Sequence, residues 1–172
     1  LWYIQIAEAT PNFESLTLTN KKHVTIDGLE GDDVFTVSLT APSAGLESLT
    51  ILGGAGSDTI QNSGNDILLS GVDLRFEAEA IRINGGAITG GDISLISETD
   101  SRGVNPFANI LNLIDLDGTQ ITADGDLLLR AVSKQKPLIS NGILEIKSTA
   151  ANILVTDSAL SAAGDLTLQT LS

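Results

Sequence analysis

A parallel β-solenoid of many short strands is the fold that this 172-residue sequence predicts, and three observations lead to it. Apolar and polar residues alternate over short stretches throughout the chain, which is the period of a half-buried strand. Turn-forming residues, among them 17 glycines, recur between these stretches. The same short phrases also return along the chain, which is typical of repeat architectures.

The expected strands have the form apolar, polar, apolar, in most cases with Thr in the middle. They occur at 16–18, 24–26, 35–37, 49–51, 81–83, 144–146 and 166–168. Two stretches, 127–129 and 153–155, carry a third apolar residue, which predicts that both faces of these strands are covered. The segment 75–83 is rich in helix formers, but apolar residues alternate with polar ones from Leu74 to Ala80, so a strand is expected there as well.

Three phrases each contain a short strand, a Gly-Asp corner and a second strand. Their corners are Gly91-Asp92, Gly125-Asp126 and Gly164-Asp165, which follow one another at sequence offsets of 34 and 39 (125 − 91 and 164 − 125). A related phrase contains Asp73, at an offset of 19 before Asp92 (92 − 73). These spacings predict a coil of about 19 residues that loops lengthen elsewhere. About nine such coils would form a rod on the order of 40 Å long.

Repetition continues in the N-terminal half. Residues 14–18 return as 47–51, an offset of 33, and residues 28–33 return loosely as 53–58. Residues 1–172 are therefore predicted to be one solenoid segment, with irregular glycine-rich turns at 28–71 and regular coils at 72–172. Loops are expected to leave the wall near 98–108 and 133–137, and any ligand contact is expected at 102–107 or 133–137. Because the chain contains no Met, we expect it to be part of a larger chain.

Charge and residue usage exclude several classes of function. With 22 Asp and Glu against 9 Lys and Arg, the net charge of −13 disfavours nucleic acid as a partner. No apolar stretch is long enough to insert into a bilayer. The absence of Cys excludes disulfides and zinc-thiolate sites. The single histidine, His23, follows two lysines at the start of a strand, where a surface position is expected. No catalytic motif accompanies it, so the chain is not expected to be an enzyme.

A fragment of a polysaccharide-active enzyme is the catalytic alternative, since such sites use paired carboxylates. The acidic candidates Asp32, Asp33, Asp58 and Asp66 lie at glycine turns, where Asp usually accepts hydrogen bonds from backbone amides. No Lys or Arg occurs among these turns, and the chain has one Trp and one Tyr. This composition favours a structural role for the carboxylates.

Residues 53–61, Gly-Gly-Ala-Gly-Ser-Asp-Thr-Ile-Gln, match the nonapeptide G-G-x-G-x-D-x-U-x, and this stretch resembles the calcium-binding RTX β-rolls. The resemblance implies a Ca²⁺ site at the turn that contains Gly54 and Gly56, with Asp58 as its main carboxylate. Residues 63–68 are similar to a second copy and add Asp66, and residues 31–35 are similar to an earlier copy and add Asp33. The alternative is a structural turn in which Asp caps backbone amides.

The Ile-Thr-x-x-Gly-Asp-Leu-x-Leu phrases, which recur over most of residues 70–172, resemble the repeats of filamentous-haemagglutinin-type exoproteins and very large bacterial surface adhesins. This resemblance implies a right-handed parallel β-helix, a location outside the cell or on the bacterial surface, and a role as stalk, filament or adhesin. Neighbouring modules or copies of the same chain are the expected partners, because the open ends of a solenoid expose unpaired strand edges. An adhesin would add a cell-surface or carbohydrate ligand. A calcium-binding β-roll remains the alternative function.

Overall fold

The computed structural model describes residues 4–6, 16–18, 20–39, 45–98, 112–132, 136–140, 143–147 and 151–171. The regular elements in these ranges are all strands. These ranges contain no helix that is long and apolar enough to cross a membrane. Most of the strands belong to three parallel sheets. This arrangement confirms the predicted all-β solenoid.

The three sheets differ in their number of strands. The six-stranded sheet contains β3 (His23–Asp27), β5 (Ser48–Leu52), β8 (Asp73–Ala78), β11 (Ile93–Glu98), β14 (Leu127–Val132) and β19 (Leu166–Leu171). The five-stranded sheet contains β4 (Val34–Thr36), β6 (Thr59–Ser63), β9 (Ala80–Asn84), β12 (Asn112–Asp117) and β17 (Ala151–Thr156). The four-stranded sheet contains β7 (Ile67–Leu68), β10 (Ala87–Gly90), β13 (Gln120–Ala123) and β18 (Ala159–Ala162).

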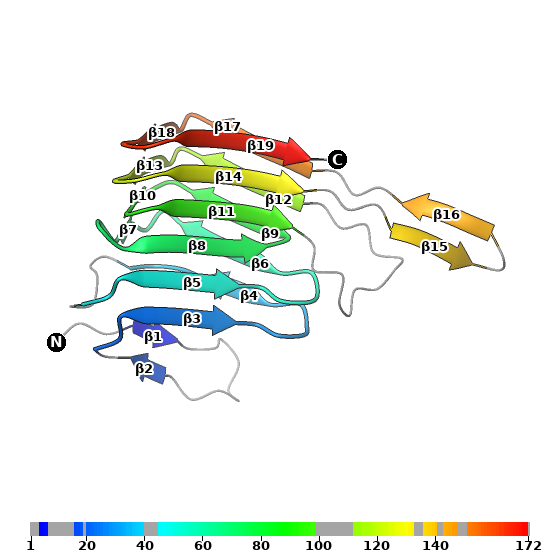
Figure 1. The fold of residues 1–172 in the computed structure, drawn as a ribbon, viewed down its shortest axis with the longest axis horizontal. Helices are drawn as coiled ribbons and strands as arrows, with labels where there is room; N and C mark the ends of the chain where they lie inside the picture. The colour runs from blue at the N-terminus through cyan, green and yellow to red at the C-terminus, as the bar shows by residue number, and fades with distance from the viewer. Residues whose placement is uncertain are drawn as a thin grey trace.

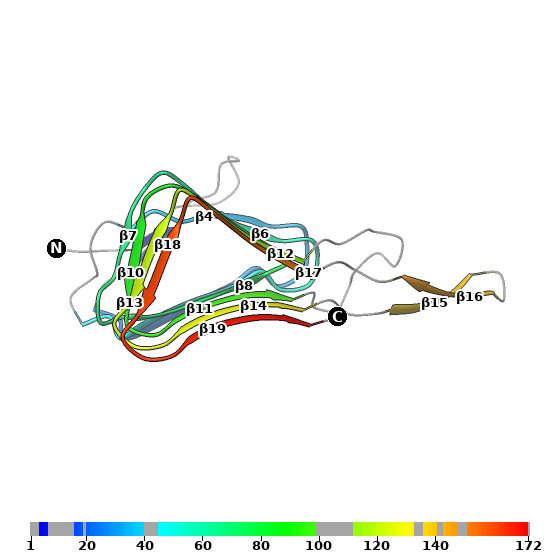
Figure 2. The same ribbon diagram turned by 90° about the horizontal axis from the view of Figure 1, so that it is seen from above.

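The chain visits the three sheets in turn (Figure 1) and forms a coil that is triangular when viewed along its axis (Figure 2). Figure 2 looks down the coil from its C-terminal end, and the chain there runs counterclockwise from β17 through β18 to β19. Because the chain also rises toward the viewer, the coil is right-handed, as predicted. The segment 75–83 supplies parts of β8 and β9, which confirms the prediction of strand over helix.

Strand register gives the length of each coil. Leu74 pairs with Ile93, Ile93 with Leu127, and Leu127 with Leu166, so the register advances by 19, then 34, then 39 (93 − 74, 127 − 93 and 166 − 127). These are the spacings that the Gly-Asp corners predicted. In each of the two N-terminal coils the register advances by 25, because His23 pairs with Ser48 and Ser48 with Asp73 (48 − 23 and 73 − 48).

Two predictions about the repeats are wrong. The similarity of 14–18 to 47–51 does not reflect stacked coils, because β2 (Leu16–Leu18) pairs antiparallel with β1 (Ile4–Ile6). The described part of the chain also forms fewer than nine coils. The longest sheet has six strands, which at about 4.8 Å between neighbours span about 24 Å.

Inward side chains align in columns that run along the coil axis. One column of the six-stranded sheet contains Val24, Leu49, Leu74, Ile93, Leu127 and Leu166. A second contains Ile26, Ile51, Phe76, Leu95, Leu129 and Leu168. In the four middle rungs, these side chains are at most 3% exposed. Each such side chain contributes about 1.5–3 kcal/mol through burial, so the stacked columns are the main source of stability.

The Gly-Asp corners join the four-stranded sheet to the six-stranded sheet, and a ladder of hydrogen bonds runs up them. Each Asp carboxylate accepts a bond from the backbone amide of the Asp in the next rung. The bonds join Asp73 Oδ1 to Asp92 N at 3.0 Å, Asp92 Oδ1 to Asp126 N at 2.8 Å, and Asp126 Oδ1 to Asp165 N at 2.8 Å. The repeated Gly-Asp phrase therefore connects rungs as well as turning the chain.

One described hairpin departs from the coil at the corner between the six-stranded and the five-stranded sheets, which we call the insertion corner. The antiparallel hairpin β15 (Lys136–Ser140) and β16 (Ile143–Lys147) lies outside the wall between β14 and β17 (Figures 1 and 2). Residues 136–137, expected in a loop, lie in β15, and the expected wall strand 144–146 lies in β16. The other residues of the two predicted loops, apart from Glu98 at the end of β11, lie outside the described residues.

The two stretches with a third apolar residue behave differently. Leu128 is partly buried, whereas Leu154 is 50% exposed and Val155 is 40% exposed. The prediction that both faces of 153–155 are covered is therefore wrong for the described part of the chain. These residues belong to β17 in the last rung, which has a neighbouring strand on one side only among the described strands.

Candidate functional site: two stacked glycine-rich turns

Two glycine-rich turns, residues 28–33 and 53–58, lie one above the other at the insertion corner. They connect β3 to β4 and β5 to β6, and the parallel register on both sides relates them by a sequence offset of 25. Their backbones are hydrogen-bonded to each other. Gly31 N donates to Ala55 O at 3.0 Å, and Ala55 N donates to Leu29 O at 2.7 Å. The loose sequence similarity between the two turns thus corresponds to a real structural repeat.

Gly54 and Gly56 allow this close stacking. A Cβ atom at Gly54 would lie 2.3 Å from Leu29 O, and one at Gly56 would lie 1.7 Å from Gly31 O. Both distances are shorter than any real contact of a Cβ atom, so a side chain at either position would push the turns apart. These two predicted site residues therefore have a structural role that does not depend on an ion.

Asp58 closes the upper turn from inside. Its side chain is 1% exposed, and its Oδ1 atom accepts a bond from Asp33 N in the turn below at 2.9 Å. Asp32 Oδ1 makes the reciprocal bond, since it accepts from Ser57 N at 2.9 Å. The carboxylates of this site thus cap backbone amides of the neighbouring rung, which was the structural alternative for the turn.

One oxygen on each of two carboxylates is left over. Asp58 Oδ2 and Asp33 Oδ2 are both buried, and neither has a hydrogen-bond partner. Burial raises the pKa of the Asp58 carboxyl above its ordinary value, and the negative charges of Asp33 and Asp32 act in the same direction. The bond from Asp33 N opposes this rise in pKa. The corner therefore holds negative charge that is incompletely compensated.

The two carboxylates belong to a polar column that sequence reasoning did not find. Val34, Thr59, Ala80 and Leu113 are paired in successive rungs, so the residues directly before them also follow one another. These preceding residues are Asp33, Asp58, Glu79 and Asn112. The last three are at most 2% exposed, and Asp58 N donates to Glu79 Oε2 at 3.0 Å. Finding this column requires knowing that the register advances by 25 in one coil (59 − 34) and by 21 in the next (80 − 59).

Asp66 lies elsewhere. It follows β6, whereas Asp58 precedes β6, so the five residues of that strand separate them. At about 3.3 Å per residue, this strand keeps the two carboxylates well beyond the reach of one ion. Asp66 Oδ1 accepts a bond from Ala87 N in the next rung at 2.9 Å. The structure therefore brings Asp58 together with Asp33 and Glu79, and does not bring it together with Asp66. Across the described ranges, no three His, Cys, Asp or Glu side chains form a recognisable metal-binding group.

A shallow depression of about 550 Å³ lies beside the lower turn and is lined by Asp27, Gly28, Leu29, Glu30 and Ala55. Leu29 is 68% exposed and has a left-handed backbone with φ of 70°, which is unfavourable for a residue with a branched side chain. Its amide donates to Asp27 Oδ1 at 3.0 Å, which helps to hold this conformation. The lower turn thus presents an apolar side chain between two carboxylates.

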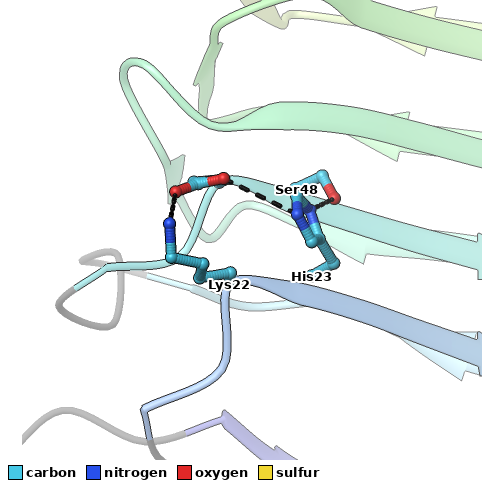
Figure 3. Close-up of polar contacts among 4 residues, drawn as sticks. Lys22, His23 and Ser48 are labelled. Carbon is cyan, nitrogen blue, oxygen red and sulfur yellow. Dashed lines mark hydrogen bonds and ion pairs between the residues drawn. The ribbon is translucent and has the colours of Figure 1, made fainter.

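The single histidine takes part in a polar cluster on the outer wall (Figure 3). His23 Nδ1 lies 2.9 Å from Ser48 Oγ, and His23 Nε2 lies 3.6 Å from Glu47 Oε2. These are the three group types of a Ser–His–carboxylate triad, but Lys22 Nζ also binds Glu47, at 2.5 Å. That bond raises the pKa of Lys22 and lowers the pKa of Glu47. All of these side chains except Ser48 are more than half exposed, so water competes for each bond, and we regard the cluster as a bridge between rungs.

Comparison with known proteins found no relative of this chain. No family model, curated protein or solved structure matches the chain.

Proposed function

We propose that this chain is a structural module of a secreted or cell-surface protein, serving as part of a stalk, filament or adhesin. The observation that carries the proposal is how the chain uses its carboxylates. At two corners and in the glycine-rich turns, they accept bonds from backbone amides of the neighbouring rung, as Asp32, Asp58, Asp66, Asp73, Asp92 and Asp126 do. Side chains used in this way hold a rod together, and the net charge of −13 keeps such a rod soluble.

The proposal is tested in cells that make the protein. Antibodies against the chain should label intact cells or the surrounding medium, and deleting the coil that contains β9 to β11 should weaken surface attachment or shorten the surface structure. Attachment should survive Thr167→Lys, because Thr167 is exposed on the last strand. Labelling that appears only after the cells are permeabilised would overturn the assignment to the surface.

Calcium binding at the insertion corner is a second candidate function, and the unpartnered oxygens of Asp58 and Asp33 favour it. Ca²⁺ prefers carboxylate and carbonyl oxygens, and the two stacked turns supply both. An ion beside Asp58 would neutralise charge that burial makes costly. With two or three carboxylates, the dissociation constant should be about 10⁻⁴ to 10⁻³ M, the range of extracellular calcium modules.

Calorimetry with Ca²⁺ tests this candidate, together with melting curves in millimolar calcium and in chelator. Asp58→Asn keeps the Oδ1 acceptor for Asp33 N but removes the charge, so it should abolish the calcium-dependent rise in Tm. Asp66→Asn is the matched control, since Asp66 lies at the other end of β6 and should leave that rise intact. An unchanged Tm in chelator, with no heat of binding, would leave the turns with a structural role only.

A further inference from the structure

The C-terminal rung is an open end of the solenoid. Among the residues that the structure describes, its strands β17, β18 and β19 each pair with a neighbour on one side only. Leu166 is 47% exposed and Leu168 is 51% exposed, although Leu127 and Leu129, directly beneath them in the same columns, are fully buried. Leu171, Leu154 and Val155 are also exposed. The rung therefore presents the cross-section of the core together with three unpaired strand edges.

A rule at the Gly-Asp corners determines which coil can cover this end. The corner residue of a rung is the one that occupies the Asp position of the Gly-Asp phrase. Wherever this residue is Asp, the rung above has Gly directly before its corner residue. The reason is geometric, because the Asp carboxylate reaches up to the next amide through the space that a side chain would fill. An ideal Cβ atom would lie 2.5 Å from Asp73 Oδ1 at Gly91, 2.0 Å from Asp92 Oδ1 at Gly125 and 2.1 Å from Asp126 Oδ1 at Gly164.

The lower rungs show the other half of the rule. The column of corner residues begins with His23 and Ser48 instead of Asp. The residues above them, in the position that Gly occupies elsewhere, are Glu47 and Val72. A residue with a side chain is thus accepted where no Asp lies beneath it. Asp165, in the last rung, consequently requires Gly in whatever rung lies above it.

We propose that the C-terminal rung is a docking surface for one further parallel coil of the same triangular type, with Gly above Asp165 and an amide that bonds to the Asp165 carboxylate. This proposal deepens the proposed structural function and depends on it. The coil would place aliphatic residues over Leu166 and Leu168 and extend the three sheets in register. Its corner would carry the Gly-Asp phrase that already recurs within this chain.

A second copy of this chain does not fit the same surface. Its first rung would place Lys22 above Asp165, where a Cβ atom would meet the carboxylate. The β1–β2 hairpin also lies beneath β3 at the N-terminal end (Figure 1). Head-to-tail stacking of copies would therefore have to break the Gly-Asp rule and displace the hairpin.

The test adds a coil to the chain in place of Leu171 and Ser172. A copy of residues 79–98, which hold β9, β10 and β11, is fused after Thr170. Thr170 is the junction because it stacks in register with Ala78, which Glu79 alone joins to β9 in the native coil. Amide exchange of β17–β19 is then measured. We expect exchange to slow by at least about tenfold, since the open edge becomes an internal strand. Amides of β8 and β11 serve as the folding control in every variant.

Two variants make the test specific. Gly91→Val within the added copy should abolish the protection, because its side chain would collide with Asp165. Combining it with Asp165→Ala in the host should restore protection, because the carboxylate is then absent.

Equal protection by the Gly and Val copies would refute the corner rule, and protection by neither copy would refute the docking surface. If amide exchange of β19 in the unmodified chain slows as protein concentration rises, and sedimentation shows end-to-end oligomers, the occupant of the docking surface is a second copy of this chain. That result would overturn the proposed coil. None of these results depends on where the protein resides in the cell, so the proposed function is tested separately.

Discussion

Leu129 and Leu168 provide a direct test of the stacked core. They are the same residue type in the same column of adjacent rungs, and they differ in burial: Leu129 is fully buried and Leu168 is 51% exposed. Replacing each by Ala removes the same atoms from two environments. A comparison of the two variants therefore isolates the contribution of the rung above.

The expected magnitudes differ by a factor of about three. At Leu129, the change removes buried methyl groups and leaves a cavity between Leu95 and Leu168, for which losses of about 2–5 kcal/mol are typical. At Leu168, about half of the side chain is already in water and the space opens to solvent, so a loss of about 1 kcal/mol is expected. For a chain of this size, each kcal/mol lowers Tm by about 2–4 °C.

Thermal and urea denaturation followed by circular dichroism measure this difference. Leu129→Ala should lower Tm by about 4–20 °C and Leu168→Ala by no more than about 4 °C. Leu129→Asp should be more damaging still, because it buries a charge without a partner. Equal losses for the two Ala variants would show that burial in this column is not as the structure has it, and a helical spectrum for the native protein would refute the fold.

Three further changes test the corners. In buffer with chelator, Asp58→Asn should have a higher Tm than the native protein at pH 7, and this difference should disappear in acid. The pKa of the Asp58 carboxyl is raised above 3.8 in the folded state. The carboxyl of Asp58 therefore makes its full contribution to stability below about pH 3.8 and loses it as pH rises through the folded-state pKa. A native protein that is more stable than this variant at pH 7 would contradict that reasoning. Gly125→Val should cost about 1–3 kcal/mol of unfolding free energy through collision with Asp92, and Asp92→Ala in that background should recover part of the loss, which urea titration can measure. Leu29→Gly should stabilise the protein by about 1 kcal/mol by relieving a left-handed backbone, and a lower Tm for this variant would show that the exposed leucine makes a stabilising contact.

The regular coils could be predicted from sequence because their signal is local. The Gly-Asp phrase satisfies a contact between one rung and the next, so it returns once per coil whatever the length of the intervening loop. The offsets of 34 and 39 can therefore be predicted from the sequence alone. The similarity between 14–18 and 47–51 misled for the opposite reason, since alternating side chains suit an antiparallel hairpin as well as a solenoid wall.

The candidate site was predicted only in part. The nonapeptide pointed to Asp58 and Gly56, but spacing along the chain suggested Asp66 as a neighbour, and β6 intervenes. Of its actual neighbours, Asp33 was predicted and Glu79 was not, and both come from adjacent coils. Residues that stack across coils are separated by whole coil lengths, and the register offset here varies from 19 to 39, so proximity in the sequence says little about them.

The unequal coil lengths have a mechanical consequence. A pull along the axis loads the strands crosswise, so their hydrogen bonds open one rung at a time instead of shearing together. Each opened coil releases its own length of chain, which corresponds to a register offset of 19 in the shortest coil and of 39 in the longest. At about 3.4 Å per extended residue, these releases amount to about 65 Å and about 130 Å. The longest coils lie toward the open C-terminal end. If the pull is applied at that end, the chain would lengthen in its largest steps first and in smaller steps as the shorter coils open.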